Sequence, residues 1–259
     1  MDIRAEVWSP LQNTAVWLGA WLHGHTSSDE TIAALQALGG THQVIDETGS
    51  HPLALIELLS QLRHFTSAAI AEGGEPILRL ILAGPGDPPS LPAGSAAAKA
   101  LEQANNAALV VRCEIPEEFL ILIPSHHEGL TTWRIIEHSG WLPAPAWLSP
   151  GEADALLSEA TEESARLIED SHYRTEAPVT PRLTVRTLAD FYDTFGLPPA
   201  VPNRAAKLFA RADRVAAIIE TVVQENSDHS IDPQLFRLWR HVRSARIAGV
   251  AYALTEFGR

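Results

Sequence analysis

The fold is decided by residues 76–138, which begin PILRLILAGPGDPP (76–89) and end LTTWRIIEH (130–138). This stretch holds four of the five strands that the sequence predicts. Each strand is a short run rich in Leu, Ile and Val and bounded by Gly or Pro, which is typical of buried strands. The five predicted strands are Thr41–Asp46, Leu78–Ala83, Ala108–Cys113, Glu118–Pro124 and Thr131–His138.

The links between these strands predict how they pair. As far as Cys113 the chain alternates strand, helix, strand, helix, strand, an order that indicates parallel pairing through crossovers. After Cys113 the links at 114–117 and 125–130 are too short for a crossover, so the last pairs are predicted to be antiparallel hairpins. We therefore expect an α/β fold: a mixed sheet of about five strands with flanking helices, followed by a C-terminal helical region.

The helices are predicted from apolar periodicity and from end signals. Ser27 and Glu30 have the spacing of a capping box, and Gly39-Gly40 is a typical helix end. The leucines of the third helix lie on one face, at positions 55, 58, 59 and 62. The predicted helices are Leu11–His23, Ser28–Leu38, Leu53–Phe65, Ser95–Ala104, Pro150–Asp170, Thr187–Phe195, Asn203–Gln224 and Pro233–Glu256.

Residues 139–150, SGWLPAPAWLSP, mark the predicted boundary between two parts of the chain. Three prolines exclude a helix here, so we expect an extended segment held in place by Trp141 and Trp147. The sequence is thus divided into an α/β domain at residues 1–148 and a C-terminal helical subdomain or layer at residues 149–259.

Composition excludes several classes of protein. With 46% hydrophobic and 20% charged residues among 259, the chain has the composition of a globular protein. A net charge of −13 opposes general binding of nucleic acid, because such a surface repels phosphate. The one cysteine, Cys113, allows no disulfide within the chain. Without a signal peptide or an apolar run of about 18 residues, we expect a cytoplasmic protein with no membrane contact.

Three segments resemble an uncharacterised family of actinobacterial proteins: LRLILAGPGDPP (78–89), TTWRI (131–135) and LPPAVPNRAAKLFARADRVAAIIE (197–220). The family pattern is a Trp-rich N-terminal helix, a PGDP turn after a strand, and an Arg- and Ala-rich helix after a Leu-Pro-Pro bend. The resemblance covers most of the chain. It implies no established activity and assigns no catalytic residue.

Few residues are candidates for chemistry, and the sequence leaves open whether the protein is an enzyme. Asp87 follows a predicted strand at the end of the sheet where α/β proteins bind ligands. The prolines around it supply no N–H groups, so the loop matches neither a dinucleotide site nor a P-loop. His126 and Glu128 point to the same side of an extended chain, but a catalytic zinc site needs a third ligand. The sequence therefore predicts no metal and no cofactor, with Asp87, His126 and Glu128 as weak catalytic candidates.

Charge is distributed unevenly along the chain. Residues 203–259 hold nine Lys and Arg against six Asp and Glu, a surplus of three positive charges that leaves −16 for the first 202 residues. Arg246 falls on the apolar side of its helix and should therefore be paired. The basic side chains predicted to face a partner or an anion form what we call the arginine stripe: Arg204, Lys207, Arg211, Arg214, Arg240, Arg243 and Arg246.

The arginine stripe has two interpretations, and with them the sequence supports three classes of function. The basic helices either dock on the acidic segment Glu152–Asp170, within the chain or across a dimer, or bind an external anion. We expect first a non-catalytic protein that acts through protein–protein contacts, self-association among them. The alternatives are a small-molecule enzyme or ligand binder near Asp87, His126 and Glu128, and nucleic-acid binding through the arginine stripe.

Overall fold

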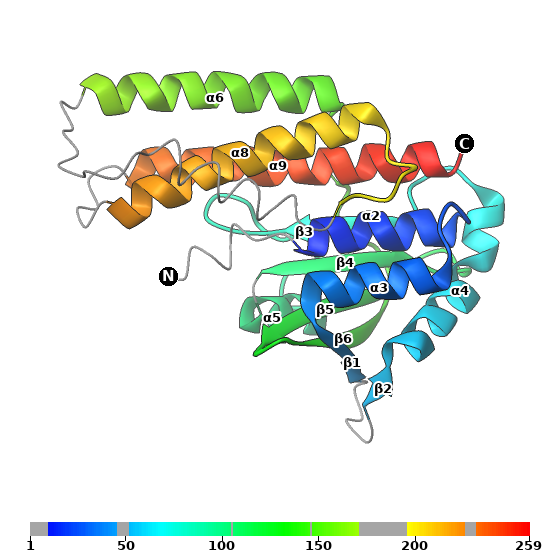
Figure 1. Ribbon diagram of the computed structural model, residues 1–259. Coiled ribbons are helices and arrows are strands. Elements are labelled where there is room, and N and C mark those ends of the chain that lie inside the picture. Colours follow the sequence, from blue (N-terminus) through cyan, green and yellow to red (C-terminus); the bar gives the residue numbers. More distant parts are fainter. Residues whose placement is uncertain (1–9, 46–51, 105, 146, 171–195, 226–231) are drawn as a thin grey trace.

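The computed structural model of the protein describes residues 10–45, 52–104, 106–145, 147–170, 196–225 and 232–259 (Figure 1). The helix predicted at Thr187–Phe195 lies outside these residues. The elements in chain order are α2 (Pro10–Leu22), α3 (Ser28–Gly39), β1 (Thr41–Ile45), β2 (Leu53–Ala54), α4 (Leu55–Glu72), β3 (Leu78–Leu82), α5 (Ala96–Gln103), β4 (Ala107–Arg112), β5 (Glu118–His127), β6 (Leu130–Ser139), α6 (Pro150–Asp170), α8 (Asn203–Glu225) and α9 (Asp232–Phe257).

The predicted α/β class with a mixed sheet is confirmed, and the sheet has six strands in the order β2-β1-β6-β5-β4-β3. The additional strand is β2, a two-residue strand that pairs antiparallel with β1. The prediction that β3 and β4 pair in parallel is wrong, because they lie side by side and antiparallel. Parallel neighbours must be joined by a crossover, but the reverse does not hold. The link that contains the eight-residue helix α5 joins two strands that are antiparallel neighbours. The parallel pair among the described strands is β1 with β6.

The predicted hairpins are confirmed, since β5 pairs antiparallel with both β4 and β6. Between β5 and β6 the ladder continues as far as the pair His127 and Leu130, which leaves a loop of two residues. Both loop residues have positive φ, 48° at Glu128 and 77° at Gly129. Two successive left-handed residues define the type I′ turn that matches the twist of paired strands.

The signals at the helix ends hold in the structure. Ser27 and Glu30 form the predicted capping box at the start of α3, and Gly40 caps its end. Helix α4 begins two residues later than predicted, after β2, and continues to Glu72. Its predicted inner face is confirmed, because Leu55, Leu58, Leu59 and Leu62 are buried.

Both faces of the sheet are covered, which explains why its strands are apolar runs rather than alternating ones. On one face, Leu80, Leu109 and Leu122 belong to a large core with side chains of α2, α4 and α9. On the other face, Ile81 and Ile121 pack with the alanines of α5. The strands therefore carry two separate cores on their two sides.

The C-terminal helices form tiers above the sheet. In Figure 1, α6 is outermost, α8 and α9 lie beneath it, and α2 with the sheet follows. These three helices have a core of their own, but Phe209 of α8 and Leu254 and Phe257 of α9 belong to the core of the sheet. Helix α9 also lies against β3, the edge strand. Covering an edge with a helix blocks pairing with strands of other molecules. No helix of the described part is long and apolar enough to cross a bilayer.

A buried histidine connects β1 to its neighbours. The Nε1–H of Trp133 donates to Nδ1 of His42 at 2.9 Å, and Nε2 of His42 lies 2.8 Å from the carbonyl oxygen of Leu35. Because Nδ1 accepts, the proton must be on Nε2, which donates to Leu35. The imidazole is therefore held neutral, and burial lowers its pKa below the ordinary value.

Stability is expected to fall as the pH drops below about 6.5, the ordinary pKa of histidine. The unfolded chain binds protons there more readily than the folded one, because burial lowers the pKa of His42, and likewise that of His23 and His241. Each histidine contributes at most about 1.4 kcal/mol per pH unit. Urea unfolding at pH 7.5 and 5.5 measures the slope, which His42→Gln should make shallower. The exposed His64→Gln is the control, and equal slopes for the two variants would contradict the assignment.

Candidate functional site

Asp87 is held between two arginines of α9. Nε and Nη2 of Arg243 donate to one carboxylate oxygen at 3.1 and 2.8 Å, and Nε of Arg240 lies 3.0 Å from the other. Arg243 also donates to the carbonyl oxygen of Pro85 at 3.1 Å. A Cβ at Gly84 would lie 2.6 Å from this guanidinium, so the turn approaches α9 without room for a side chain. The carboxylate of Asp87 thus connects the turn after β3 to α9.

His126 and Glu128 lie at the β5–β6 hairpin and have other neighbours. Nδ1 of His126 is 3.2 Å from the hydroxyl of Thr131, which donates to the carbonyl oxygen of Gly39. Glu128 is a turn residue, and its carboxylate lies 3.8 Å from Nε2 of His127 at the surface. Within the described residues, no group of three or more His, Cys, Asp or Glu side chains is placed to hold a metal ion.

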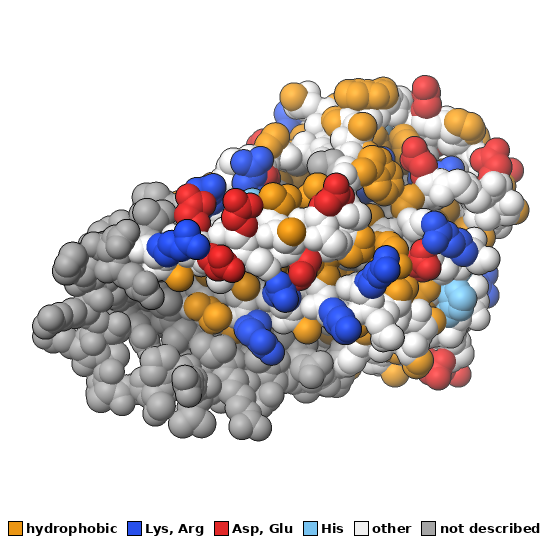
Figure 2. All heavy atoms as spheres, turned by 90° about the horizontal axis from the view of Figure 1, so that it is seen from above, with side chains coloured by type: hydrophobic (Ala, Val, Ile, Leu, Met, Phe, Trp, Pro, Cys, Tyr) orange, Lys and Arg blue, Asp and Glu red, His pale blue; other side chains and the backbone are white. Residues whose placement is uncertain are grey.

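Most of the arginine stripe lies against acidic side chains of the same chain. Arg211 pairs with Asp154 of α6 at 3.1 Å, and Arg246, which is 1% exposed, pairs with Asp213 at 2.8 Å. Arg237, beside the stripe, pairs with Glu163 of α6 at 2.7 Å. The remaining members, Arg204, Lys207 and Arg214, are exposed on α8. Figure 2 shows the face above α6, where acidic and basic side chains lie interspersed with apolar ones.

The segment before α6 differs from its prediction. Trp141 and Trp147 were expected to hold it in place, but they are 71% and 56% exposed. The segment is held instead by Leu142, which is buried, and by Arg79, whose Nη1 donates to the carbonyl oxygen of Pro143 at 2.9 Å. Two tryptophans of one short segment are therefore open to solvent, where large apolar side chains often mark a binding surface.

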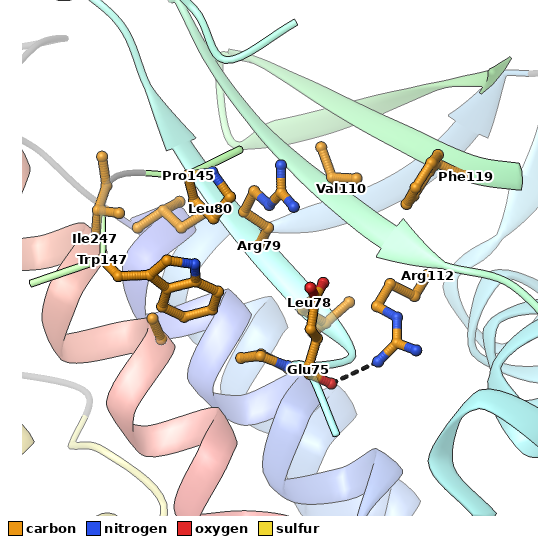
Figure 3. Close-up of a pocket in the computed structure, with 12 residues that line it drawn as sticks. Glu75, Leu78, Arg79, Leu80, Val110, Arg112, Phe119, Pro145, Trp147 and Ile247 are labelled. Atoms are coloured by element: carbon orange, nitrogen blue, oxygen red, sulfur yellow. Dashed lines mark hydrogen bonds between the residues drawn. The ribbon is translucent and has the colours of Figure 1, made fainter. Parts of the chain in front are cut away.

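These tryptophans border a groove. Two adjoining hollows, with volumes of about 30 and 440 Å³, share Arg79, Phe119 and Trp147. Their walls come from the end of α4 and β3 (72–80), the β4–β5 turn (112–119), the segment at 140–145 and 147, and α9. We call this surface the Trp groove, and Figure 3 shows its inner part, with Trp147 beside α9 and Phe119 across the sheet.

The charges of the Trp groove are mostly negative. Its lining includes the exposed glutamates 72, 75, 114, 117 and 118. Its two arginines donate to carbonyl oxygens, Arg79 to Pro143 and Arg112 to Glu75 at 2.6 Å. Burial lowers the pKa of Arg79, the nearby charge of Glu75 opposes that shift, and arginine stays protonated. The groove therefore combines an apolar floor with a rim whose carboxylates outnumber its cations.

Sequence reasoning did not identify the Trp groove, because its residues come from four segments that are far apart in the chain. One signal was present: two tryptophans among prolines, in a segment that cannot form a helix. The acidic part of the groove, with Glu114, Glu117 and Glu118 of the β4–β5 turn, lies beside these tryptophans only in the folded chain.

Two protein-family models match the chain, "Rv1486c-like protein, N-terminal domain" at residues 12–147 and "Rv1486c-like protein, C-terminal domain" at residues 151–247. The chain is similar to two proteins of Mycobacterium tuberculosis, "Uncharacterized protein MT1533" of strain CDC 1551 / Oshkosh and "Uncharacterized protein Rv1486c" of strain ATCC 25618 / H37Rv. Each is 23% identical over 241 residues, which cover 82% of this chain and 82% of the relative. No solved structure matches significantly. The predicted resemblance to an uncharacterised actinobacterial family is confirmed.

Proposed function

We propose, from the premise that this chain belongs to the Rv1486c-like protein family, that it is a non-catalytic cytoplasmic protein that binds another protein in the Trp groove. The observation that carries this proposal is the exposure of Trp141 and Trp147 beside a hollow of about 440 Å³. Tryptophan is enriched among the residues that dominate binding energy at protein interfaces. Two of them on one short segment are the strongest binding feature of the described surface.

The positions of the catalytic candidates support a non-catalytic role. Asp87 is neutralised by Arg240 and Arg243, so it is neither a general base open to substrate nor a free ligand. His126 and Glu128 lie on a hairpin turn with contacts of their own. A general acid and base must reach one reacting atom, and these three side chains are bound to different neighbours.

The arginine stripe is a weaker candidate for nucleic acid than its sequence suggests. Arg211, Arg243 and Arg246 each pair with a carboxylate of this chain. An arginine that binds phosphate would first have to release that partner, and affinity for DNA grows with the number of phosphates neutralised. The first interpretation, docking on the acidic segment Glu152–Asp170, is supported for Arg211 and Arg237, which pair with Asp154 and Glu163. The partners of Arg243 and Arg246, Asp87 and Asp213, lie outside that segment.

The proposal is tested by affinity capture from cell lysate, comparing the tagged full chain with the Trp141→Ala/Trp147→Ala variant. We expect at least one protein to be retained by the wild type and lost by the variant. Ile56→Ala, which truncates a side chain that is 53% exposed on α4, is the matched control and should retain it. Identical profiles for all three proteins would contradict a role for the Trp groove.

Self-association is a second proposal, because Arg204, Lys207 and Arg214 stay exposed on α8 while the rest of the chain is acidic. Two copies could meet through these charges, which are worth little individually when solvated. Sedimentation velocity over a concentration series should then show a mass twice that of one chain. Changing all three residues to Glu should return the mass to one chain, and a wild-type monomer at every concentration would end this proposal.

A further inference from the structure

We infer that the occupant of the Trp groove is an extended, partly apolar segment of a partner protein that carries at least one Lys or Arg. This inference rests on the proposed function and adds the chemistry of the partner. It follows from three properties of the groove: the sign of its charge, the aromatic surface beside that charge, and its size.

The charge of the groove calls for a cation. Five glutamates stand against Arg79 and Arg112, a balance of three negative charges. The ion pairs of the described residues include none of these five glutamates, whereas the carboxylates of Asp87, Asp154 and Asp213 are all paired. A Lys or Arg of a partner would therefore find carboxylates that have no competing cation at contact distance.

The aromatic surface suits the same group. Trp141 and Trp147 are more than half exposed, and a cation within about 6 Å of a Trp ring is attracted by its quadrupole. The chain uses this contact elsewhere, because the guanidinium of Arg63 lies 4.3 Å from the ring centroid of Trp21. Ile115, which is 55% exposed, and Phe119 add apolar surface for the remaining side chains of the segment.

The size of the groove limits how much of an occupant it can enclose. A hollow of about 440 Å³ lies within the range of pockets that enclose one small ligand, so it takes a few side chains of a partner rather than a folded domain. An extended chain can place single side chains into it while its backbone lies along the rim.

Other occupants fit less well. A nucleic acid would bring phosphates to a rim with a surplus of three carboxylates, which is repulsive. A second copy of this chain carries the same net charge of −13, which opposes its approach to a rim of carboxylates. Both remain as outcomes of the test.

Panning random decapeptides displayed on phage against the full chain tests the inference. We expect the selected peptides to carry Lys or Arg next to an apolar residue and to lose binding at least tenfold on Trp147→Ala. Replacing the basic residue of a selected peptide by Gln should weaken Kd tenfold or more in calorimetry. The control Glu102→Gln, in an exposed glutamate of α5, should leave Kd unchanged.

The outcomes separate this inference from the proposed function. Peptides that need Trp147 but have no basic residue would overturn the inference and leave the proposed function standing. Failure to select any peptide, together with lysate capture that Trp141→Ala/Trp147→Ala does not change, would end both. Binding of a 20-nucleotide single strand, or dimerisation abolished by Trp147→Ala, would replace the basic peptide with nucleic acid or with a second copy.

Substitutions at Glu117 separate an effect on peptide binding from an effect on stability, because its backbone is left-handed, with φ of 68°. Its carbonyl oxygen accepts from the N–H of Gly140 at 2.8 Å, which joins the turn to the Trp segment. Glycine adopts this conformation without strain, so Glu117→Gly should raise the melting temperature by about 2–4 °C while weakening the selected peptide at least threefold. Glu117→Gln should weaken the peptide equally with no gain in melting temperature. Unchanged peptide affinity in both variants would contradict a binding role for this carboxylate.

Discussion

Asp87→Ala is expected to lower the free energy of unfolding by about 3 kcal/mol. The reason lies in Arg243, whose side chain is only 8% exposed and donates two hydrogen bonds to the carboxylate of Asp87. Removing one partner of such a pair leaves a charge that is desolvated and uncompensated. Arg240 contributes less, because its side chain is 59% exposed and water can replace the carboxylate. Urea unfolding at pH 7.5 measures the loss.

A second variant separates the lost pair from a general effect of the turn. In Asp87→Ala/Arg243→Met the buried charge is absent, so we expect the double variant to recover more than half of the loss. Asp29→Ala, in an exposed position of α3, should change stability by less than about 0.5 kcal/mol. If Asp87→Ala were as mild as this control, Asp87 would not be the main connection between the turn and α9.

A chain that ends at residue 148 is expected to be insoluble, although the two family models meet at this point. It lacks the side chains of Phe209, Val250, Leu254 and Phe257, which are buried in the core of the sheet. Four such side chains contribute about 6–12 kcal/mol by burial, which is comparable to the whole stability of a domain. The truncation also uncovers β3, whose outer edge α9 covers. Fractionation after expression measures the soluble share.

Supplying the missing part separately is the control for this truncation. Co-expression of residues 149–259 should return residues 1–148 to the soluble fraction as a complex, because the contacts between the two parts are not covalent. A soluble 1–148 fragment that unfolds cooperatively without its partner would contradict the expectation. In that case residues 1–148 would be an independent domain in the physical sense as well as in the family models.

The parts of the fold that could be predicted depend on interactions between near neighbours in the chain. The capping box at Ser27 involves residues three positions apart, and the β5–β6 hairpin follows from a link too short for a crossover, although its loop has two residues rather than the six predicted at 125–130. The pairing of Arg246 was also predictable, because a helical period places it on the apolar side, where a lone charge is too costly.

The parts that could not be predicted depend on distant segments. The antiparallel pairing of β3 and β4 is set by where the chain returns to the sheet, which a helix between them does not determine. The role of Asp87 depends on residues about 155 positions later in the chain, on a helix that packs across the turn. Trp141 and Trp147 are large apolar residues of the kind found in cores, and their exposure, next to the buried Leu142, depends on how the segment packs on distant parts of the chain.

Two contacts of the N-terminal part form only after later parts of the chain have been synthesised. Strand β1 pairs in parallel with β6, and Gly19 of α2 contacts Leu254 of α9. At a synthesis rate of about 5–20 residues per second, roughly 10–50 s separate the emergence of these two residues from the ribosome. Throughout that interval the part of α2 that packs on α9 has no final neighbour, although α3 and Arg63 already cover Trp21. Such a segment is a natural client for a ribosome-associated chaperone, and depleting one should reduce the yield of this protein more than that of proteins with local contacts.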